Sequence, residues 1–168
     1  IGGGVAGASV AIAAARTGAD VLIVAGVGSD AATAHAQGGI AAAIGVGDSP
    51  AAHAADTARA AAGMGDARAI DVLTREGADR VLALIADGLA VDRHADGRVA
   101  LGLEAAHDRA RIVHAGGDRS GAVLADHLTA RVLAMGIEVL SPARMVELVV
   151  RNDAVTGAIV AGESGTLQ

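Results

Sequence analysis

The stretch IGGGVAGA, residues 1–8, decides the fold that this sequence predicts. Gly2, Gly4 and Gly7 form a G-x-G-x-x-G pattern at the start of an alanine-rich segment. In such a turn the first glycine bends the chain, and the second lets a pyrophosphate approach the backbone. The third lets a helix pack closely on a strand, while the free N–H groups of that helix face the anion. The pattern therefore predicts a dinucleotide-binding turn between a strand and a helix, with a chance glycine turn as the alternative.

The segments around this turn have the order of a βαβ unit. Ile1 is expected to end a strand, and Val5–Thr17 is expected to form a helix that Gly18 terminates. The short apolar run Asp20–Val24 is typical of a buried parallel strand. The fold class that follows is α/β, a Rossmann-like doubly wound parallel sheet.

Further elements are predicted along the rest of the chain. Gly26–Gly39 has no period and reads as a loop, and Asp66–Asp87 reads as one helix or as two broken at Gly77. Helices are also expected at 50–62, with Ser49 as N-cap and Pro50 at its first position, and at 120–134. Strands are expected at 89–91 and 98–101 around an Asp96-Gly97 turn, at 111–114, at 137–140, and in a C-terminal hairpin of 145–151 and 155–161. No repeat or linker divides the chain, so a single domain is expected.

Composition excludes several classes of function. The net charge is −6 and all 13 basic residues are arginine, without a basic stripe, which argues against nucleic acid and anionic membranes as partners. The apolar runs are shorter than the roughly 20 residues that span a bilayer, so no membrane insertion is expected, and no signal peptide is visible. The absence of cysteine excludes disulfides and thiol chemistry and agrees with a cytoplasmic location.

One expected feature of a dinucleotide site is missing. An acidic residue near the end of the second strand commonly holds the ribose, but that position here reads Val24, Ala25, Gly26. Asp20 precedes the strand and Asp30 follows it by several residues. NAD is therefore less favoured than another dinucleotide.

The polar residues of this alanine-rich chain gather in two places. In TAHAQGGIAA, residues 33–42, Thr33 and Gln37 could hydrogen-bond a ligand, and Gly38-Gly39 would let a flat ring lie on bare backbone. A purely structural loop, with His35 on its surface, is the alternative. The second place, LEAAHDRARIVHAGGD at residues 103–118, concentrates seven polar side chains: Glu104, His107, Asp108, Arg109, Arg111, His114 and Asp118.

Four segments together carry a resemblance to a known family. IGGGVAGASVAIAAARTG, ATAHAQGGIAAA, DSPAAHAADTARAAAGMGD and LGLEAAHDRARIVHAGGDRSG occur in this order. They resemble the L-aspartate oxidases of the succinate dehydrogenase/fumarate reductase flavoprotein superfamily. The resemblance covers essentially all 168 residues and implies the N-terminal part of an FAD-binding domain, without the capping and C-terminal helical domains.

The resemblance implies where FAD and substrate bind. Glu104 is implied to orient the substrate through its α-ammonium group, a charge-assisted contact, with His107 and Arg111 as further catalytic residues. A surface ion pair of Glu104 with Arg109 or Arg111 is the alternative. His114 and Asp118 are expected to hold the loop. The implied FAD contacts are Gly2, Gly3, Gly4, Val5, Ala6 and Gly7 at the pyrophosphate, and Ala32, Thr33, Ala34, His35, Ala36, Gln37, Gly38 and Gly39 on the flavin side.

The sequence departs from the family pattern at four positions. Leu103 replaces an arginine, Asp108 a serine and Ala25 a basic residue, and each change removes a polar contact. Ala32 replaces a serine. In succinate dehydrogenase flavoproteins a histidine near this position links FAD covalently. Alanine cannot form that bond, so FAD is expected to be non-covalent.

The implied reaction is the oxidation of L-aspartate to iminoaspartate, the first step of NAD biosynthesis via quinolinate. Hydride would pass from the substrate Cα to the flavin, with O2 or fumarate as electron acceptor and coupling to quinolinate synthase as a possible partnership. The 168 residues alone are expected to be inactive. Two alternatives remain open: a fumarate reductase or succinate dehydrogenase flavoprotein subunit, and a non-catalytic dinucleotide-binding module.

Overall fold

The computed structural model describes residues 1–26, 32–104, 106–162 and 165–167, and their contacts form two compact units. The first unit contains residues 1–35 and 124–168, and the second contains residues 36–123. No linker-like composition marks either boundary. Asp30 and part of the Gly26–Gly39 segment lie outside the described residues.

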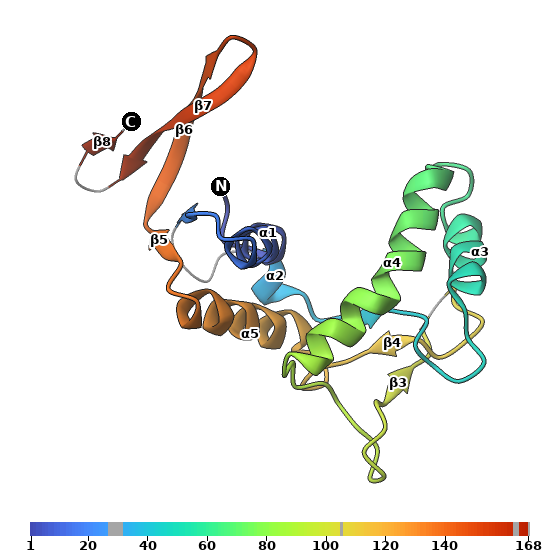
Figure 1. The fold of residues 1–168 in the computed structure, drawn as a ribbon. Coiled ribbons are helices and arrows are strands. Elements are labelled where there is room, and N and C mark those ends of the chain that lie inside the picture. Colours follow the sequence, from blue (N-terminus) through green and yellow to red (C-terminus); the bar gives the residue numbers. More distant parts are fainter. Residues whose placement is uncertain (27–31, 105, 163–164, 168) are drawn as a thin grey trace. The chain divides into compact units, whose positions relative to one another are not determined.

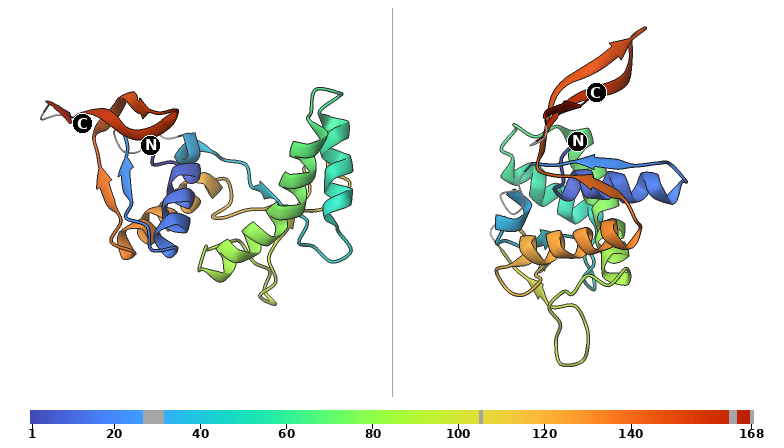
Figure 2. Two further views of the ribbon diagram at one scale, coloured as in Figure 1. Left: turned by 45° about the horizontal axis from the view of Figure 1, so that its top comes forward. Right: turned by 90° about the vertical axis from the view of Figure 1, so that its left-hand side faces the viewer.

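The first unit is built around a parallel pair of strands. β1 (Leu22–Val24) pairs with β5 (Glu138–Leu140), with Ile23 opposite Val139. The helix α1 (Val5–Arg16) packs against β1, as Figure 2 shows. Gly18 follows α1 with φ +85°, in the left-handed conformation expected after a helix end. These elements confirm the α/β class with a parallel sheet, although β1 is shorter than the expected strand.

An antiparallel hairpin completes the first unit (Figure 1). β6 (Ala143–Arg151) and β7 (Ala154–Gly162) are joined by Asn152-Asp153, and β7 pairs in turn with β8 (Gly165–Leu167). Both turn residues have positive φ, as a tight two-residue hairpin requires. The hairpin is confirmed, and β8 was not predicted. Val24, Ala143 and Val160 form a buried cluster, while four aliphatic side chains of the hairpin are exposed: Val146, Leu148, Val150 and Val155.

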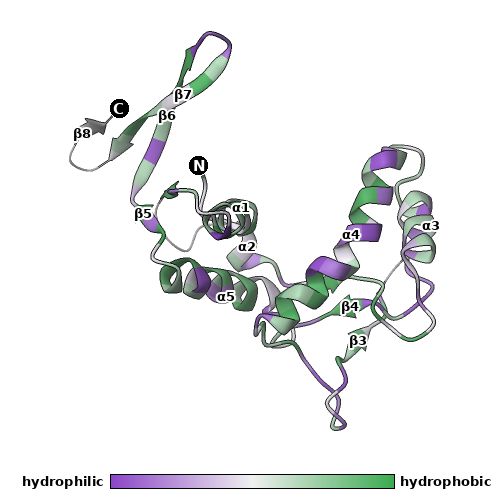
Figure 3. Cartoon of the chain, viewed as in Figure 1, coloured by the Kyte–Doolittle hydropathy of each residue, from purple (hydrophilic) through white to green (hydrophobic). Residues whose placement is uncertain are grey.

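The second unit contains two helices. α3 (Pro50–Ala60) begins at Ser49, whose hydroxyl accepts a hydrogen bond from the Ala52 N–H at 3.1 Å. α4 (Ala67–Ala86) packs against α3 and is one continuous helix that Gly77 does not break. Hydrophobic and hydrophilic residues alternate along α4 (Figure 3). Both helices were predicted, because caps and helical periodicity are local signals.

The sheet of the second unit is small, and two of its strands overlap the strands expected at 98–101 and 111–114. β4 (Ile112–Val113) lies between β2 (Ile40–Ala41) and β3 (Leu101–Gly102), antiparallel to both. The Asp96-Gly97 turn is present, with φ +85° at Gly97, but it joins only an isolated bridge between Arg93 and Val99. The strand expected at 89–91 is wrong. Leu89 and Val91 are buried, but the run has no partner strand among the described residues.

Two remaining helices lie near the two boundaries of the second unit in the sequence. α5 (Ser120–Ala134) has the predicted bounds and is followed by Gly136 at φ +67°. α2 (Ala32–His35) is a single helical turn within the segment predicted as loop, so that part of the loop prediction is wrong. One turn is too short to produce a periodic pattern.

Candidate functional site

The glycine turn of the first unit has the geometry that its pattern predicts. Gly2 has φ +98°, and its N–H donates to the Val24 carbonyl at 2.8 Å, so the turn starts beside the end of β1. A Cβ on Gly7 would overlap the carbonyl oxygen of Gly2. Gly4 caps α1 in an extended conformation without a side-chain hydrogen bond, and the first turn of α1 carries no acidic residue. This helix start suits an anion, because Gly4 has no side chain to cap it and no carboxylate lies in the first turn of α1.

Thr33 joins the start of the second polar segment to this turn. Its hydroxyl accepts a hydrogen bond from the Val5 N–H at 3.3 Å, and it lies 3.5 Å from where a Cβ on Gly4 would stand. Ala32, Ala34 and His35 share the short helix α2 with Thr33. Eight of the predicted FAD-contacting positions up to Thr33 are thereby brought together in the first unit: residues 2–7, 32 and 33.

The rest of that segment belongs to the second unit. The Ala36 carbonyl accepts a hydrogen bond from the Gly121 N–H at 2.9 Å. Gly39 packs on β4 so closely that a Cβ would overlap Ile112 and the Val113 carbonyl oxygen. Gly38 has open space around it and lines a pocket together with Gln37. Gly39 is therefore required for strand packing, whereas Gly38 leaves the backbone accessible.

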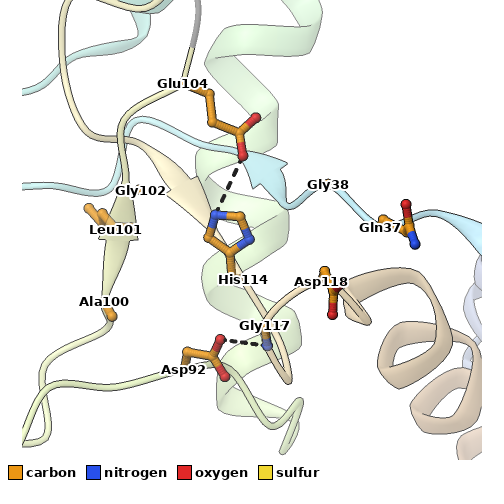
Figure 4. Close-up of a pocket in the computed structure, with 10 residues that line it drawn as sticks. All are labelled: Gln37, Gly38, Asp92, Ala100, Leu101, Gly102, Glu104, His114, Gly117 and Asp118. Atoms are coloured by element: carbon orange, nitrogen blue, oxygen red, sulfur yellow. Dashed lines mark hydrogen bonds and ion pairs between the residues drawn. The ribbon is translucent and has the colours of Figure 1, made fainter.

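The pocket of the second unit has a volume of about 570 Å³ (Figure 4). Glu104 and His114 point toward each other across it, and Glu104 Oε1 lies 3.6 Å from His114 Nε2. Asp92 accepts hydrogen bonds at 2.9 Å from the N–H groups of Gly116 and Gly117. The lining residues are Gln37, Gly38, Asp92, Ala100, Leu101, Gly102, Glu104, His114, Gly117 and Asp118.

The pocket changes the interpretation of two residues, and it contains a third residue that the sequence did not indicate. His114 and Asp118, expected to hold the loop, both line the pocket. Asp92 was missed, because it lies 24 residues before Gly116 and no local motif marks it. The carboxylates of Asp92, Glu104 and Asp118 make the pocket acidic, and His114 is the single basic side chain among its ten lining residues.

Arg111 lies in a buried ion-pair cluster and does not line the pocket. Its guanidinium donates two hydrogen bonds to Asp48, both at 2.9 Å, and one to Asp56 at 2.7 Å. The side chains are 0%, 2% and 3% exposed, respectively. An ion pair between Arg111 and Glu104 is therefore excluded as an interpretation, because Asp48 and Asp56 take up the guanidinium. Arg111 lies at the end of the segment between β3 and β4 that carries Glu104.

The same cluster anchors the segment between β3 and β4. The Asp108 N–H donates to Asp56 at 3.0 Å, and Arg59 donates to both Asp56 and Asp108. The His107 ring nitrogen Nδ1 lies 3.2 Å from Arg111 Nη1. His107 thus supports Arg111 and, like Arg111, does not line the pocket.

Charges and burial shift the ionisation of this cluster. The Asp108 N–H, with Arg59 and Arg111, lowers the pKa of Asp56 to about 2, although burial opposes the shift. Burial lowers the pKa of His53, and the Arg111 charge lowers it further. His53 is 5% exposed, lies 5.5 Å from the His107 ring, and leaves its Nδ1 without a hydrogen-bond partner among the described residues. His53 is therefore neutral in the folded chain at neutral pH.

These shifts predict that acidification destabilises the chain in two stages. The folded state binds fewer protons than the unfolded state at both groups, so the free energy of unfolding falls as the pH is lowered. His53 contributes to this fall below pH 6.5, the ordinary pKa of histidine. Asp56 contributes between pH 3.8, the ordinary pKa of aspartate, and its lowered pKa of about 2. Urea unfolding at pH 7.5, 5 and 3 measures both stages.

A variant separates the histidine stage from the carboxylate stage. His53→Gln should flatten the fall in stability between pH 7.5 and 5, because glutamine does not titrate. His94→Gln, at an exposed position on the 93–99 turn, is the control and should keep the slope of the unsubstituted chain. Equal slopes for both variants would show that His53 is not the group responsible.

Two features are absent from the described residues. Within the described residues, no three or more His, Asp or Glu side chains form a group able to hold a metal ion. Across the same part of the chain, no helix combines the length and apolar character needed to span a bilayer.

Comparison with known proteins places this geometry in context. The model of the FAD binding domain family matches residues 1–167. L-aspartate oxidase from Streptomyces coelicolor is 38% identical over 160 residues, which cover 95% of this chain and 28% of that protein. L-aspartate oxidase from Caulobacter vibrioides is 42% identical over 148 residues, covering 86% of this chain and 29% of the relative. The chain thus spans less than a third of the length of these relatives.

Solved structures agree with the fold. Sdh1 of Mycobacterium smegmatis, in complex with UQ1, matches with a TM-score of 0.87 and 28% identity, covering 95% of this chain and 29% of Sdh1. The open conformation of a flavocytochrome c3 fumarate reductase matches with a TM-score of 0.86 and 27% identity. That match covers 98% of this chain and 30% of the other.

Proposed function

The chain belongs to the FAD binding domain family, and from this premise we propose that it is the N-terminal part of a flavoenzyme that oxidises L-aspartate to iminoaspartate. In this proposal the reaction begins NAD biosynthesis via quinolinate, with O2 or fumarate as acceptor and quinolinate synthase as the enzyme it supplies. One observation carries it. Gln37 and Gly38, proposed for the flavin side, and Glu104, proposed for the substrate, line the same acidic pocket.

The residues of the first unit fit the pyrophosphate of FAD. Gly2–Gly7 supply bare backbone at the start of α1, and no acidic residue in its first turn repels an anion. Thr33 closes on the same helix start through the Val5 N–H. FAD is held there without a covalent bond in this proposal, since Ala32 has no side-chain nucleophile.

The residues of the second unit are proposed to bind and orient the amino acid. Glu104 is 51% exposed and faces the pocket, where its carboxylate can pair with an α-ammonium group. Asp92 accepts hydrogen bonds from the N–H groups of Gly116 and Gly117 and so fixes the loop that contains these two glycines. When bound, FAD supplies the hydride acceptor. The chain's own contribution is to hold the Cα–N bond of the substrate in one orientation.

Binding of FAD to this chain is the first test. Saturating FAD should raise the melting temperature, because a ligand at about 100 times its dissociation constant adds about 2.7 kcal/mol to stability. The chain has no Trp or Tyr, so bound flavin dominates its near-ultraviolet and visible spectrum after gel filtration. A melting temperature unchanged by FAD would refute the proposed cofactor site.

The reaction itself is tested in a chimaera. Joining this chain to the part of the Streptomyces coelicolor relative that it does not cover should give a flavoprotein that oxidises L-aspartate and not succinate. Glu104→Gln should lower kcat/KM for aspartate by about 10- to 100-fold, the loss of a charge-assisted contact of roughly 1.5–3 kcal/mol, without lowering flavin content. Turnover of succinate in place of aspartate would favour a succinate dehydrogenase type of subunit, the alternative that the similarity to Sdh1 raises.

A further inference from the structure

His114 is the cationic counterpart of Glu104 within the pocket. It follows β4 directly, its side chain is 28% exposed, and its Nε2 lies 3.6 Å from Glu104 Oε1 (Figure 4). Gly102 makes room for the ring, because a Cβ there would stand 2.8 Å from Nε2 and 3.3 Å from Cδ2. The ring is thus held between β3 and the carboxylate of Glu104.

The groups around this pair carry negative charge or none. Asp92 faces the pocket from the segment before β3, and Asp118 faces it from the segment before α5. Gln37 lies before β2 and is neutral. His107 interacts with Arg111 outside the pocket. Among the residue types that line the pocket, histidine is the one whose side chain ordinarily changes charge near neutral pH.

We propose that His114 is a positioning residue whose protonation state determines whether Glu104 can accept an ammonium group. Protonated His114 pairs with Glu104 and occupies the place of a ligand cation. Neutral His114 no longer pairs with Glu104, which leaves the carboxylate free for a ligand cation. This inference rests on the proposed role of Glu104 and adds the condition under which that role is available.

The proposal has a direct consequence for affinity. An ammonium ion competes with a proton on His114, so its binding weakens as the pH falls through the range in which imidazole becomes charged. A simple cation site without histidine differs in that its affinity stays flat through this range until the carboxylate itself is protonated.

Methylammonium chloride is the probe, because it carries the cation without the rest of an amino acid. Titration into the 15N-labelled chain is followed through the amide signals of Gly102 and Gly117, with sodium chloride at equal ionic strength as blank. We expect binding at pH 8 and at least about fivefold weaker binding at pH 5.5, where an ordinary imidazole is mostly protonated.

Four variants make the test specific. His114→Gln should bind methylammonium equally at both pH values, because the competing charge is gone. Glu104→Gln should lose binding at both. His94→Gln, at the exposed turn outside the pocket, should keep the pH dependence of the unsubstituted chain. Gly102→Ala should alter the pH dependence without removing either charge, since it displaces the His114 ring.

The outcomes separate this inference from the proposed function. A His114→Gln variant that keeps the pH dependence overturns the role of His114, as does failure of the unsubstituted chain to bind methylammonium at either pH. Binding with the expected pH dependence, in a chain whose chimaera does not oxidise aspartate, supports the role of His114 and refutes the proposed reaction.

Discussion

Replacing Arg111 with methionine is expected to lower the free energy of unfolding of the chain by about 3–5 kcal/mol, the usual cost of breaking a buried ion pair. The substitution leaves Asp48 and Asp56 buried at 2% and 3% exposure without their shared cation. It also frees the segment between β3 and β4, because Asp56 then faces Asp108 with only Arg59 to balance the charge. Urea unfolding followed by circular dichroism measures the loss.

Two further variants control this prediction. Arg98→Met removes the exposed pair with Asp96, whose side chains are 75% and 50% exposed, and should cost no more than about 1 kcal/mol. Combining Arg111→Met with Asp48→Asn and Asp56→Asn removes the uncompensated charges and should recover part of the loss. A single variant within about 1 kcal/mol of the unsubstituted chain, or a triple variant less stable than the single one, would contradict the ion-pair interpretation.

Gly7→Ala is expected to be the second large effect, with a cost of about 1–3 kcal/mol or more, because it forces atoms into a packed space. The added methyl group would overlap the Gly2 carbonyl oxygen, which is part of the backbone and cannot rotate away as a side chain can. The start of α1 must therefore move away from the glycine turn. We expect a lower melting temperature and, since the same turn is the proposed pyrophosphate site, weaker binding of FAD.

Gly77→Ala is the matched control for this substitution. Gly77 lies within α4, and a Cβ there meets nothing within 4 Å. Alanine is the better helix former by about 1 kcal/mol, so this variant should be more stable than the unsubstituted chain. The same chemical change is thus expected to have opposite signs at two helical positions. Equal effects at both would mean that the close approach of Gly7 to Gly2 does not exist in solution.

The features that the sequence predicted well depend on neighbouring residues. The glycine turn at the start of α1, the Ser49 cap with Pro50, and the Asn152-Asp153 turn each need only a few adjacent positions. The end of α5 before Gly136 is of the same kind. In each case the backbone conformation is selected by a hydrogen bond or a φ angle within one turn of the chain.

The features that the sequence did not predict depend on distant residues. Arg111 lies 63 positions from Asp48 and 55 from Asp56, so nothing local indicates that all three are buried together. A two-residue strand such as β2 has no alternation to detect. His114 was interpreted as a structural residue, because only the register of β3 and β4 brings it beside Glu104.

The C-terminal hairpin of β6 and β7 has a practical consequence for work with the isolated chain. Val146, Leu148, Val150 and Val155 are 44–61% exposed on a hairpin, and exposed aliphatic strands readily add to strands of other molecules. Self-association through this hairpin would increase with protein concentration and with the kosmotropic salts used in crystallisation. Polar substitutions on β6 and β7, far along the sequence from Gly7 and Arg111, are therefore the first changes to make when preparing the chain for spectroscopy.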